Sequence, residues 1–118
     1  MLESSATARI VLTTVANSEE ATRLGRTFVE EGLVACATLI PAIESIYRWK
    51  GKLESAVESM LLLKTSTAQL TALEARLHEL HSYETPEFLV LPIEAGSRGY
   101  LAWMSRGLSS RTAEAGTE

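Results

Sequence analysis

The feature that most constrains this chain is a long strand pattern that folds back on itself. Residues 33–65 show the side-chain alternation of a β-strand both before and after Lys50-Gly51, a dipeptide typical of a tight hairpin turn. Pro41 interrupts the first half, and because proline cannot donate to a β-ladder it indicates an edge, a bend or a bulge. Typical strands have about 5–6 residues, so the pattern predicts a hairpin longer than a small sheet needs, with a polar tip and an apolar base.

Strand and helix patterns alternate along the rest of the 118 residues. Asn17 is a helix N-cap and Gly32 a helix terminator, and Ser66 with Gln69 has the form of a capping box. Besides the hairpin, the predicted elements are a strand at 8–16, helices at 18–31 and 66–81, a strand at 87–93 and a short helix at 98–106.

The element order is β-α-β-β-α-β followed by a helix. This order predicts an α+β, ferredoxin-like domain over residues 1–106, with an antiparallel sheet and two helices on one face. Residues 107–118 contain one large apolar side chain and no aromatic ring, so we expect a disordered tail there. The other face of the sheet also carries apolar side chains, which the two helices leave uncovered and which a second copy of the chain would cover.

Charge and cysteine content limit the classes of function. The net charge is −4 and no run of basic residues occurs, which disfavours nucleic acid and anionic membranes as partners. Cys36 is the single cysteine, so no intrachain disulfide forms, as expected for the reducing cytoplasm. The amino terminus has no basic segment before an apolar run, and we expect no signal peptide.

Three groups of residues resemble a known family in their spacing and order. They are Ala35–Pro41 continuing to Ser45–Lys52, His81–Glu87, and Tyr100–Trp103. The chain is similar here to the CutA divalent-cation tolerance family, over about residues 9–104. The resemblance implies a homotrimer with the architecture of the PII signalling proteins, strand pairing between subunits through the long hairpin, and a link to copper and other divalent metals.

The candidate metal ligands are Cys36, His81 and Glu84. Cys36 is either a soft ligand for copper or a small buried hydrophobic residue. His81 and Glu84 are either ligands, too few to close a site, or structural groups that cap a helix and tie a turn to its neighbour. Copper-holding relatives offer further Cys or His where this chain has Thr13 and Leu80, so we expect metal binding to be weak or indirect.

Other side chains are candidates for ligand binding and for subunit contact. Lys64 either holds an anion near a helix N-terminus or is a solvated strand end, while Tyr83 and Glu87 flank the His81 turn. The aromatic residues Tyr47, Trp49 and Trp103 are expected to anchor the interface between subunits.

Three functions are compatible with these residues. The first is a homotrimeric, PII-like module of divalent-metal response, with a small molecule or a signalling protein as its partner. The second is a small-molecule sensor that binds an anion or nucleotide between subunits near His81, Glu84 and Lys64. The third is an enzyme that uses His81 and Glu84 as acid and base. We expect no enzyme, because the chain has no aspartate and none of the phosphate-loop, dinucleotide or metalloprotease motifs.

Overall fold

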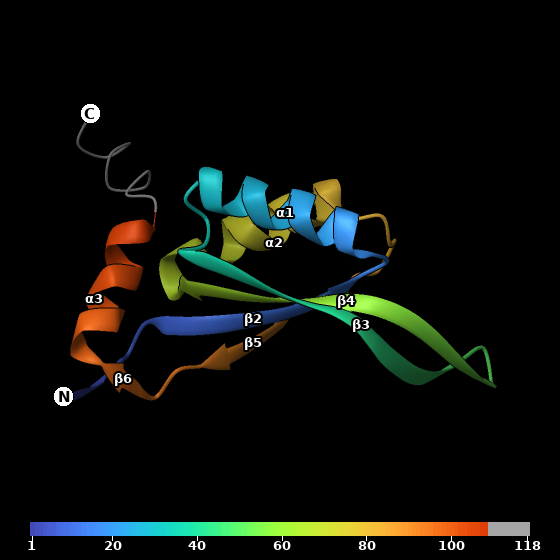
Figure 1. The fold of residues 1–118 in the computed structure, drawn as a ribbon, viewed down its shortest axis with the longest axis horizontal. Coiled ribbons are helices and arrows are strands. Elements are labelled where there is room, and N and C mark those ends of the chain that lie inside the picture. Colours follow the sequence, from blue (N-terminus) through green and yellow to red (C-terminus); the bar gives the residue numbers. More distant parts are fainter. Residues whose placement is uncertain (109–118) are drawn as a thin grey trace.

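The structure, a computed structural model, describes residues 1–108. Its main sheet has the strand order β3-β4-β2-β5, and all neighbours are antiparallel (Figure 1). The strands are β2 (Ala8–Val15), β3 (Cys36–Trp49), β4 (Lys52–Ser66) and β5 (Leu89–Pro92). This order is that of a ferredoxin-like sheet, as the sequence predicted.

Two helices cover one face of the sheet: α1 (Ser18–Glu30) and α2 (Leu70–Leu80), which follows a 3-10 turn at Thr67–Gln69 (Figure 1). Asn17 caps α1, since its Oδ1 accepts a hydrogen bond from the Glu20 backbone N–H at 2.8 Å. Ser66 stands at the predicted N-cap of the second helix, but its hydroxyl bonds the Gln69 side chain instead of the backbone.

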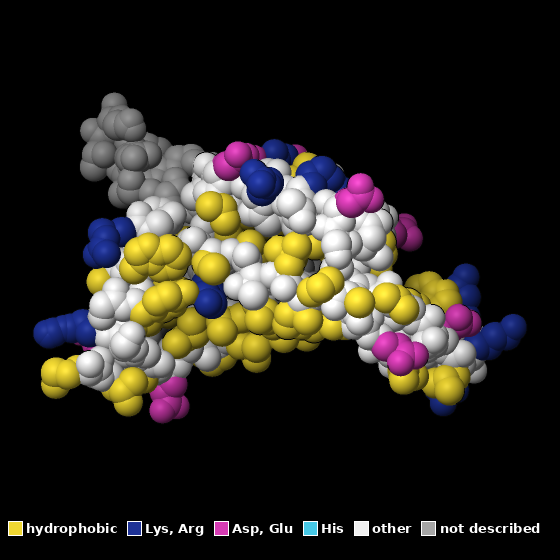
Figure 2. All heavy atoms as spheres, viewed as in Figure 1, with side chains coloured by type: hydrophobic (Ala, Val, Ile, Leu, Met, Phe, Trp, Pro, Cys, Tyr) yellow, Lys and Arg dark blue, Asp and Glu magenta, His cyan; other side chains and the backbone are white. Residues whose placement is uncertain are grey.

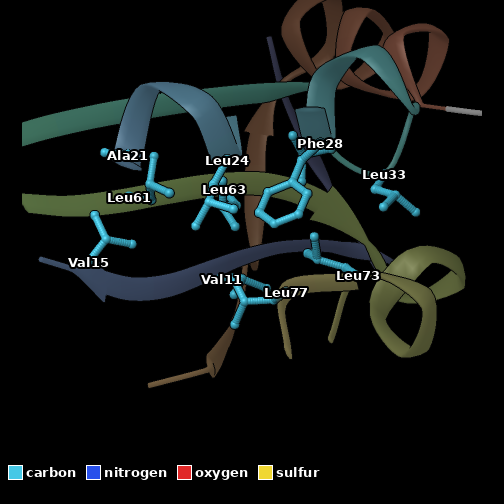
Figure 3. Packing of buried hydrophobic residues seen from close by; sticks show 11 residues of the cluster. Val11, Val15, Ala21, Leu24, Phe28, Leu33, Leu61, Leu63, Leu73 and Leu77 are labelled. Carbon is cyan, nitrogen blue, oxygen red and sulfur yellow. The ribbon is translucent and has the colours of Figure 1, made fainter. Parts of the chain in front are cut away.

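Between the helices and the sheet lies a fully buried core centred on Phe28 (Figure 3). The inward-facing positions of β2 and β4 alternate, as in a half-buried antiparallel sheet. Side chains from these strands meet apolar residues of both helices; the cluster is Val11, Val15, Ala21, Leu24, Phe28, Leu33, Val34, Leu61, Leu63, Leu73 and Leu77.

The predicted hairpin is present, with a turn and a bulge where the sequence placed them. Lys50 and Gly51 have φ values of 52° and 80°, the left-handed pair that a two-residue turn of type I′ requires. The register of β3 against β4 shifts between Ile40 and Ile43, beside Pro41, and Ala42 has a φ of 58°. One extra residue on β3 bends the strand at this bulge. The hairpin beyond it curves away from the helical layer (Figure 1).

The opposite face of the sheet carries apolar side chains that no helix covers. Figure 2 shows hydrophobic side chains along this underside of the sheet, away from α1 and α2. Among them Leu89 and Leu91 on the edge strand β5 are 55% and 44% exposed, and Ile40 on β3 is 39% exposed. A single protomer therefore leaves a broad apolar surface open to solvent.

A two-stranded ribbon at the other end of the sheet escaped sequence analysis, whereas the short helix predicted at 98–106 is present there. Strands β1 (Leu2–Ser4) and β6 (Ala95–Ser97) form a separate two-stranded ribbon. Helix α3 (Arg98–Gly107) packs Met104 against Ala8 and Ala35, and half-buried Leu108 joins this second cluster. Gly107 and Leu108, the first two residues of the predicted tail, belong to the described chain, and residues 109–118 of that tail lie outside it.

Candidate functional site

An open hollow of about 700 Å³ lies where the hairpin bends away from the sheet. The segment between α2 and β5 forms one wall of this hollow, and the bent hairpin forms the other. Within the described part of the chain it is lined by Thr14, Ser45, Ile46, Tyr47, Trp49, Glu58, Tyr83, Glu84, Thr85 and Glu87. The sequence predicted five of these as site or interface residues, and the hollow brings them together.

A short hydrogen bond between Tyr83 and Glu58 joins the two walls. The Tyr83 hydroxyl donates to Glu58 Oε2 at 2.6 Å, within the range of charge-assisted bonds to a carboxylate. Glu58 is only 8% exposed. Burial, together with the bond to Glu58, raises the pKa of Tyr83 well above its usual value, so the phenol keeps its proton and remains a donor. Sequence analysis missed Glu58, because a lone glutamate on a strand carries no motif.

The hollow is acidic. Three of its lining residues, Glu58, Glu84 and Glu87, are glutamates, and none of the ten lining residues named above is Lys, Arg or His. Burial, and then the nearby charge of Glu58, raise the pKa of Glu87 above its ordinary value. Glu84 is exposed to solvent. Negative charge at this density attracts cations and disfavours the anion or nucleotide that sequence analysis had considered.

His81 is locked inside the protein by both of its ring nitrogens. Nε2 lies 2.8 Å from the Thr14 carbonyl oxygen, and Nδ1 accepts the backbone N–H of Tyr83 at 3.0 Å. Because the carbonyl accepts and the N–H donates, the ring is neutral with its proton on Nε2. Glu20 Oε2 lies 3.8 Å from Nδ1. This distance is too long for a hydrogen bond, so Glu20 does not compete with the Tyr83 N–H for that nitrogen. No nitrogen lone pair is left for a metal.

Glu20, in the first turn of α1, holds the turn after His81. Its two oxygens accept hydrogen bonds from the backbone N–H and the hydroxyl of Ser82, each at 2.9 Å. Burial alone would raise the pKa of Glu20, but these bonds outweigh burial, so the net pKa lies below the ordinary value. Glu20 therefore has the turn-tying role that sequence analysis had offered as the structural alternative for Glu84.

The remaining candidates lie at a different place. Lys64 and Cys36 are cross-strand neighbours on the uncovered face, near α3. The Lys64 ammonium donates to the Tyr100 hydroxyl at 3.0 Å, a bond that raises the pKa of Lys64. Lys64 is six residues along β4 from Glu58, about 20 Å at about 3.3 Å per residue. One protomer therefore does not place Lys64 beside Glu84 or His81.

The proposed ligand set Cys36, His81 and Glu84 is thus not a metal site within a protomer. No group of three or more His, Cys or acidic side chains in residues 1–108 is arranged to hold a metal ion. Cys36 is half-buried and its Sγ lies 3.7 Å from the Thr38 hydroxyl. A closed site for a transition metal needs about four ligands, which these residues do not supply.

The predicted interface residues are exposed in the protomer. Tyr47, Trp49 and Trp103 are 43%, 61% and 44% exposed. The first two lie on the hairpin beside the hollow, and Trp103 lies on α3, where its ring centre is 5.3 Å from that of Tyr100. No helix in the described chain is both long and apolar enough to cross a membrane.

The fold and the site define a class: ferredoxin-like α+β proteins with an extended hairpin that bends over one end of the sheet. Comparison with known proteins narrows this class to one family. The family model of the CutA1 divalent ion tolerance protein matches residues 9–107, nearly all of the described chain. The chain therefore belongs to the CutA1 divalent ion tolerance family.

Individual relatives agree with this assignment. The divalent-cation tolerance protein CutA of Pectobacterium atrosepticum is 41% identical over 99 residues, which are 84% of this chain and 90% of that protein. The structure of CutA from Synechococcus elongatus is 40% identical with a TM-score of 0.89, covering 92% of this chain and 96% of that one. A structure of CutA from the same organism, complexed with a Bis-Tris molecule, is 39% identical with a TM-score of 0.85, covering 92% and 100%.

Proposed function

We propose that this protein acts as a homotrimeric, PII-like cytoplasmic module of divalent-cation tolerance, that it is not an enzyme, and that its contact with copper or other metals is weak or indirect. The observation that carries the proposal is the state of His81. Its two ring nitrogens are occupied by Thr14 and Tyr83, and the described residues contain no alternative cluster of three ligands. Tolerance then depends on signalling or on a small ligand rather than on sequestering metal.

The trimer is supported by what one protomer leaves uncovered. The underside of the sheet carries exposed apolar residues, and β3 and β5 each have a free edge in the four-stranded sheet. Free edges are hazards that proteins usually pair or cover. A closed ring of three copies that pairs the hairpins would satisfy the edges and bury Tyr47 and Trp49 without leaving an end for fibre growth.

Calorimetric titration with copper(II) and zinc(II), beside sedimentation velocity, tests the proposal. We expect a trimer and metal affinities that are micromolar or weaker, because no described cluster offers three ligands. Cys36→Ser and Glu84→Gln should change these affinities little. Nanomolar affinity in the wild type, or a monomeric wild type, would contradict the proposal.

A second candidate function is the binding of a small organic molecule in the hollow. The hollow of about 700 Å³ has the size of a small-molecule site. The Synechococcus elongatus relative is complexed with Bis-Tris, an amine with several hydroxyl groups, which supports a binding role of this kind. In a trimer built on the hairpin, the hollow would lie at the margin of the subunit contact, beside Tyr47 and Trp49.

A further inference from the structure

We propose that His81 is a proton-sensitive switch for the hairpin. Uptake of one proton from solvent at Nδ1 would break the hydrogen bond from the Tyr83 backbone, pair the ring with Glu20, and release the hold of Tyr83 on Glu58 of β4. The proposal goes beyond the tolerance module proposed above, and it depends neither on metal binding nor on the trimer.

The ring of His81 makes two hydrogen bonds that only its neutral form can make together. The side chain is 0% exposed. Nε2–H donates to the Thr14 carbonyl, and the lone pair of Nδ1 accepts from the Tyr83 N–H. A second proton would occupy that lone pair, and two N–H groups would then face each other with their nitrogens 3.0 Å apart. Protonation is therefore incompatible with the present position of the Tyr83 backbone.

Glu20 of α1 is a counter-ion already in place for the charged ring. Its Oε2 lies 3.8 Å from Nδ1. A shift of about 1 Å would bring the two atoms within range of a charge-assisted hydrogen bond. Burial raises the pKa of Glu20, but the bonds from Ser82 outweigh burial and the net pKa lies below the ordinary value. Glu20 is therefore ionised where imidazoles ordinarily take up a proton, and its charge offsets the cost of a buried imidazolium.

The groups that face the ring come from three elements. Helix α1 presents Glu20, β2 presents the uncharged Thr14 carbonyl, and the turn after α2 presents Tyr83. The ring centre of Tyr83 lies 4.7 Å from that of His81. Burial, and then the bond to Glu58, raise the pKa of the Tyr83 phenol, so it keeps its proton. Of these three groups Glu20 alone is charged, and it is the one to which a protonated ring would turn.

Tyr83 carries the change from the ring to the hairpin. Its backbone N–H bonds His81 and its hydroxyl donates to Glu58 at 2.6 Å, so one residue connects the buried ring to β4. A displacement of about 1 Å would lengthen the bond to Glu58 beyond hydrogen-bond range. Glu58 pairs with Ile43 immediately after the bulge where the hairpin bends. Loss of the bond would therefore let the hairpin change its bend at this point.

The exposed His78 on α2 is an internal control, because the chain has two histidines. A Trp103→Phe background leaves Trp49 of the hairpin as the single tryptophan. Trp49 fluorescence and the NMR signals of both imidazole rings are followed in the full-length protein from about pH 8 to about pH 5, the range in which imidazoles titrate. We expect one fluorescence transition, with a midpoint that agrees with the titration of His81 to within about 0.3 pH units.

His81→Gln and His78→Gln distinguish the buried ring from the exposed one. Glutamine keeps a donor and an acceptor but takes up no proton, so His81→Gln should abolish the transition, while His78→Gln should move its midpoint by less than about 0.3 pH units. A transition that survives in His81→Gln, or disappears in His78→Gln, would overturn the proposal. So would a His81 titration without a Trp49 response, or no His81 titration above about pH 5.

Glu20→Gln and Glu19→Gln test the counter-ion, and they keep the proposal testable if His81→Gln does not fold. Both remove one negative charge from the first turn of α1, but Glu19 is exposed to solvent. Loss of the facing carboxylate should lower the midpoint by at least about 1 pH unit, and loss of the exposed one by less than about 0.3. Equal shifts would show that the ring responds to net charge rather than to Glu20, and would refute the switch.

Discussion

The hydrogen bond from Tyr83 to Glu58 should be the strongest single polar contact in the hollow. Tyr83→Phe removes the hydroxyl but keeps the ring, whose centre lies 4.7 Å from that of His81. Glu58 is 8% exposed and would lose its only hydrogen-bond partner within residues 1–108. Water cannot easily replace that partner, so the stability loss includes the cost of a poorly solvated carboxylate.

The magnitude follows from the charge and the burial. Hydrogen bonds to charged groups contribute about 1.5–3 kcal/mol, and the length of 2.6 Å with deep burial points to the upper half of that range. Tyr83→Phe should therefore lower the free energy of unfolding by about 2–3 kcal/mol. Glu58→Gln should cost less, about 1 kcal/mol, because the amide oxygen still accepts. In the double variant the losses should not add, with a coupling of about 1–2 kcal/mol.

Urea unfolding at equal protomer concentration is the appropriate assay, since any assembly makes apparent stability depend on concentration. Tyr47→Phe is the matched control: Tyr47 lines the same hollow, is 43% exposed, and its hydroxyl has no partner in the described chain. It should change stability by less than about 0.5 kcal/mol. Equal losses in the two Tyr→Phe variants, or strict additivity with Glu58→Gln, would refute the reasoning.

Two further changes test the interface and the turn. Trp49→Ala should cost the assembly about 3–4 kcal/mol per site and yield smaller species in sedimentation velocity. Trp49 is 61% exposed in a protomer, and about 150 Å² of its surface would be buried between subunits. Val29→Ala, at an exposed position of α1, is the control, and an intact trimer with unchanged melting temperature would contradict the interface. Glu20→Gln should cost about 1–2 kcal/mol at neutral pH through its bonds to Ser82. Because the folded-state pKa of Glu20 is lowered, its contribution is present above the unfolded pKa and lost as pH falls through the folded value. The wild type and this variant should therefore converge in stability in acid, and a constant difference down to acidic pH would count against the lowered pKa.

Much of the fold was predictable because local chemistry determined it. Lys50-Gly51 indicated the turn, Asn17 indicated the cap of α1, and Pro41 indicated the bulge. Each did so through a local preference that acts within a few residues. The ribbon of β1 and β6 was not predictable in this way. Its two strands have three residues each and pair across more than 90 positions of the chain, so no local pattern indicates them.

The candidate site was predicted less well than the fold. Sequence analysis found the turn at His81–Glu87 but left its histidine open between a metal ligand and a structural group, because a sequence does not show that Thr14 and the Tyr83 backbone occupy both ring nitrogens. It grouped Lys64 with this turn across a subunit interface; within one protomer the length of β4 separates them, and the prediction between subunits stays a prediction. Glu58 escaped notice because its role arises from burial, which depends on the tertiary fold.

The bulge at Pro41 and Ala42 links the fold to the site through strand register. Before the bulge, Ile40 of β3 pairs with Met60, and after it Ile43 pairs with Glu58, so β3 advances three residues while β4 advances two. Side chains of a strand alternate between faces, and one extra residue therefore reverses which positions of β3 face the uncovered side. Without it, Tyr47 and Trp49 would point to the face away from Glu58. The extra residue brings these rings to the carboxylates and also bends the hairpin over them. A single backbone irregularity, with a φ of 58° at Ala42, thus creates both the aromatic wall and the shape of the hollow.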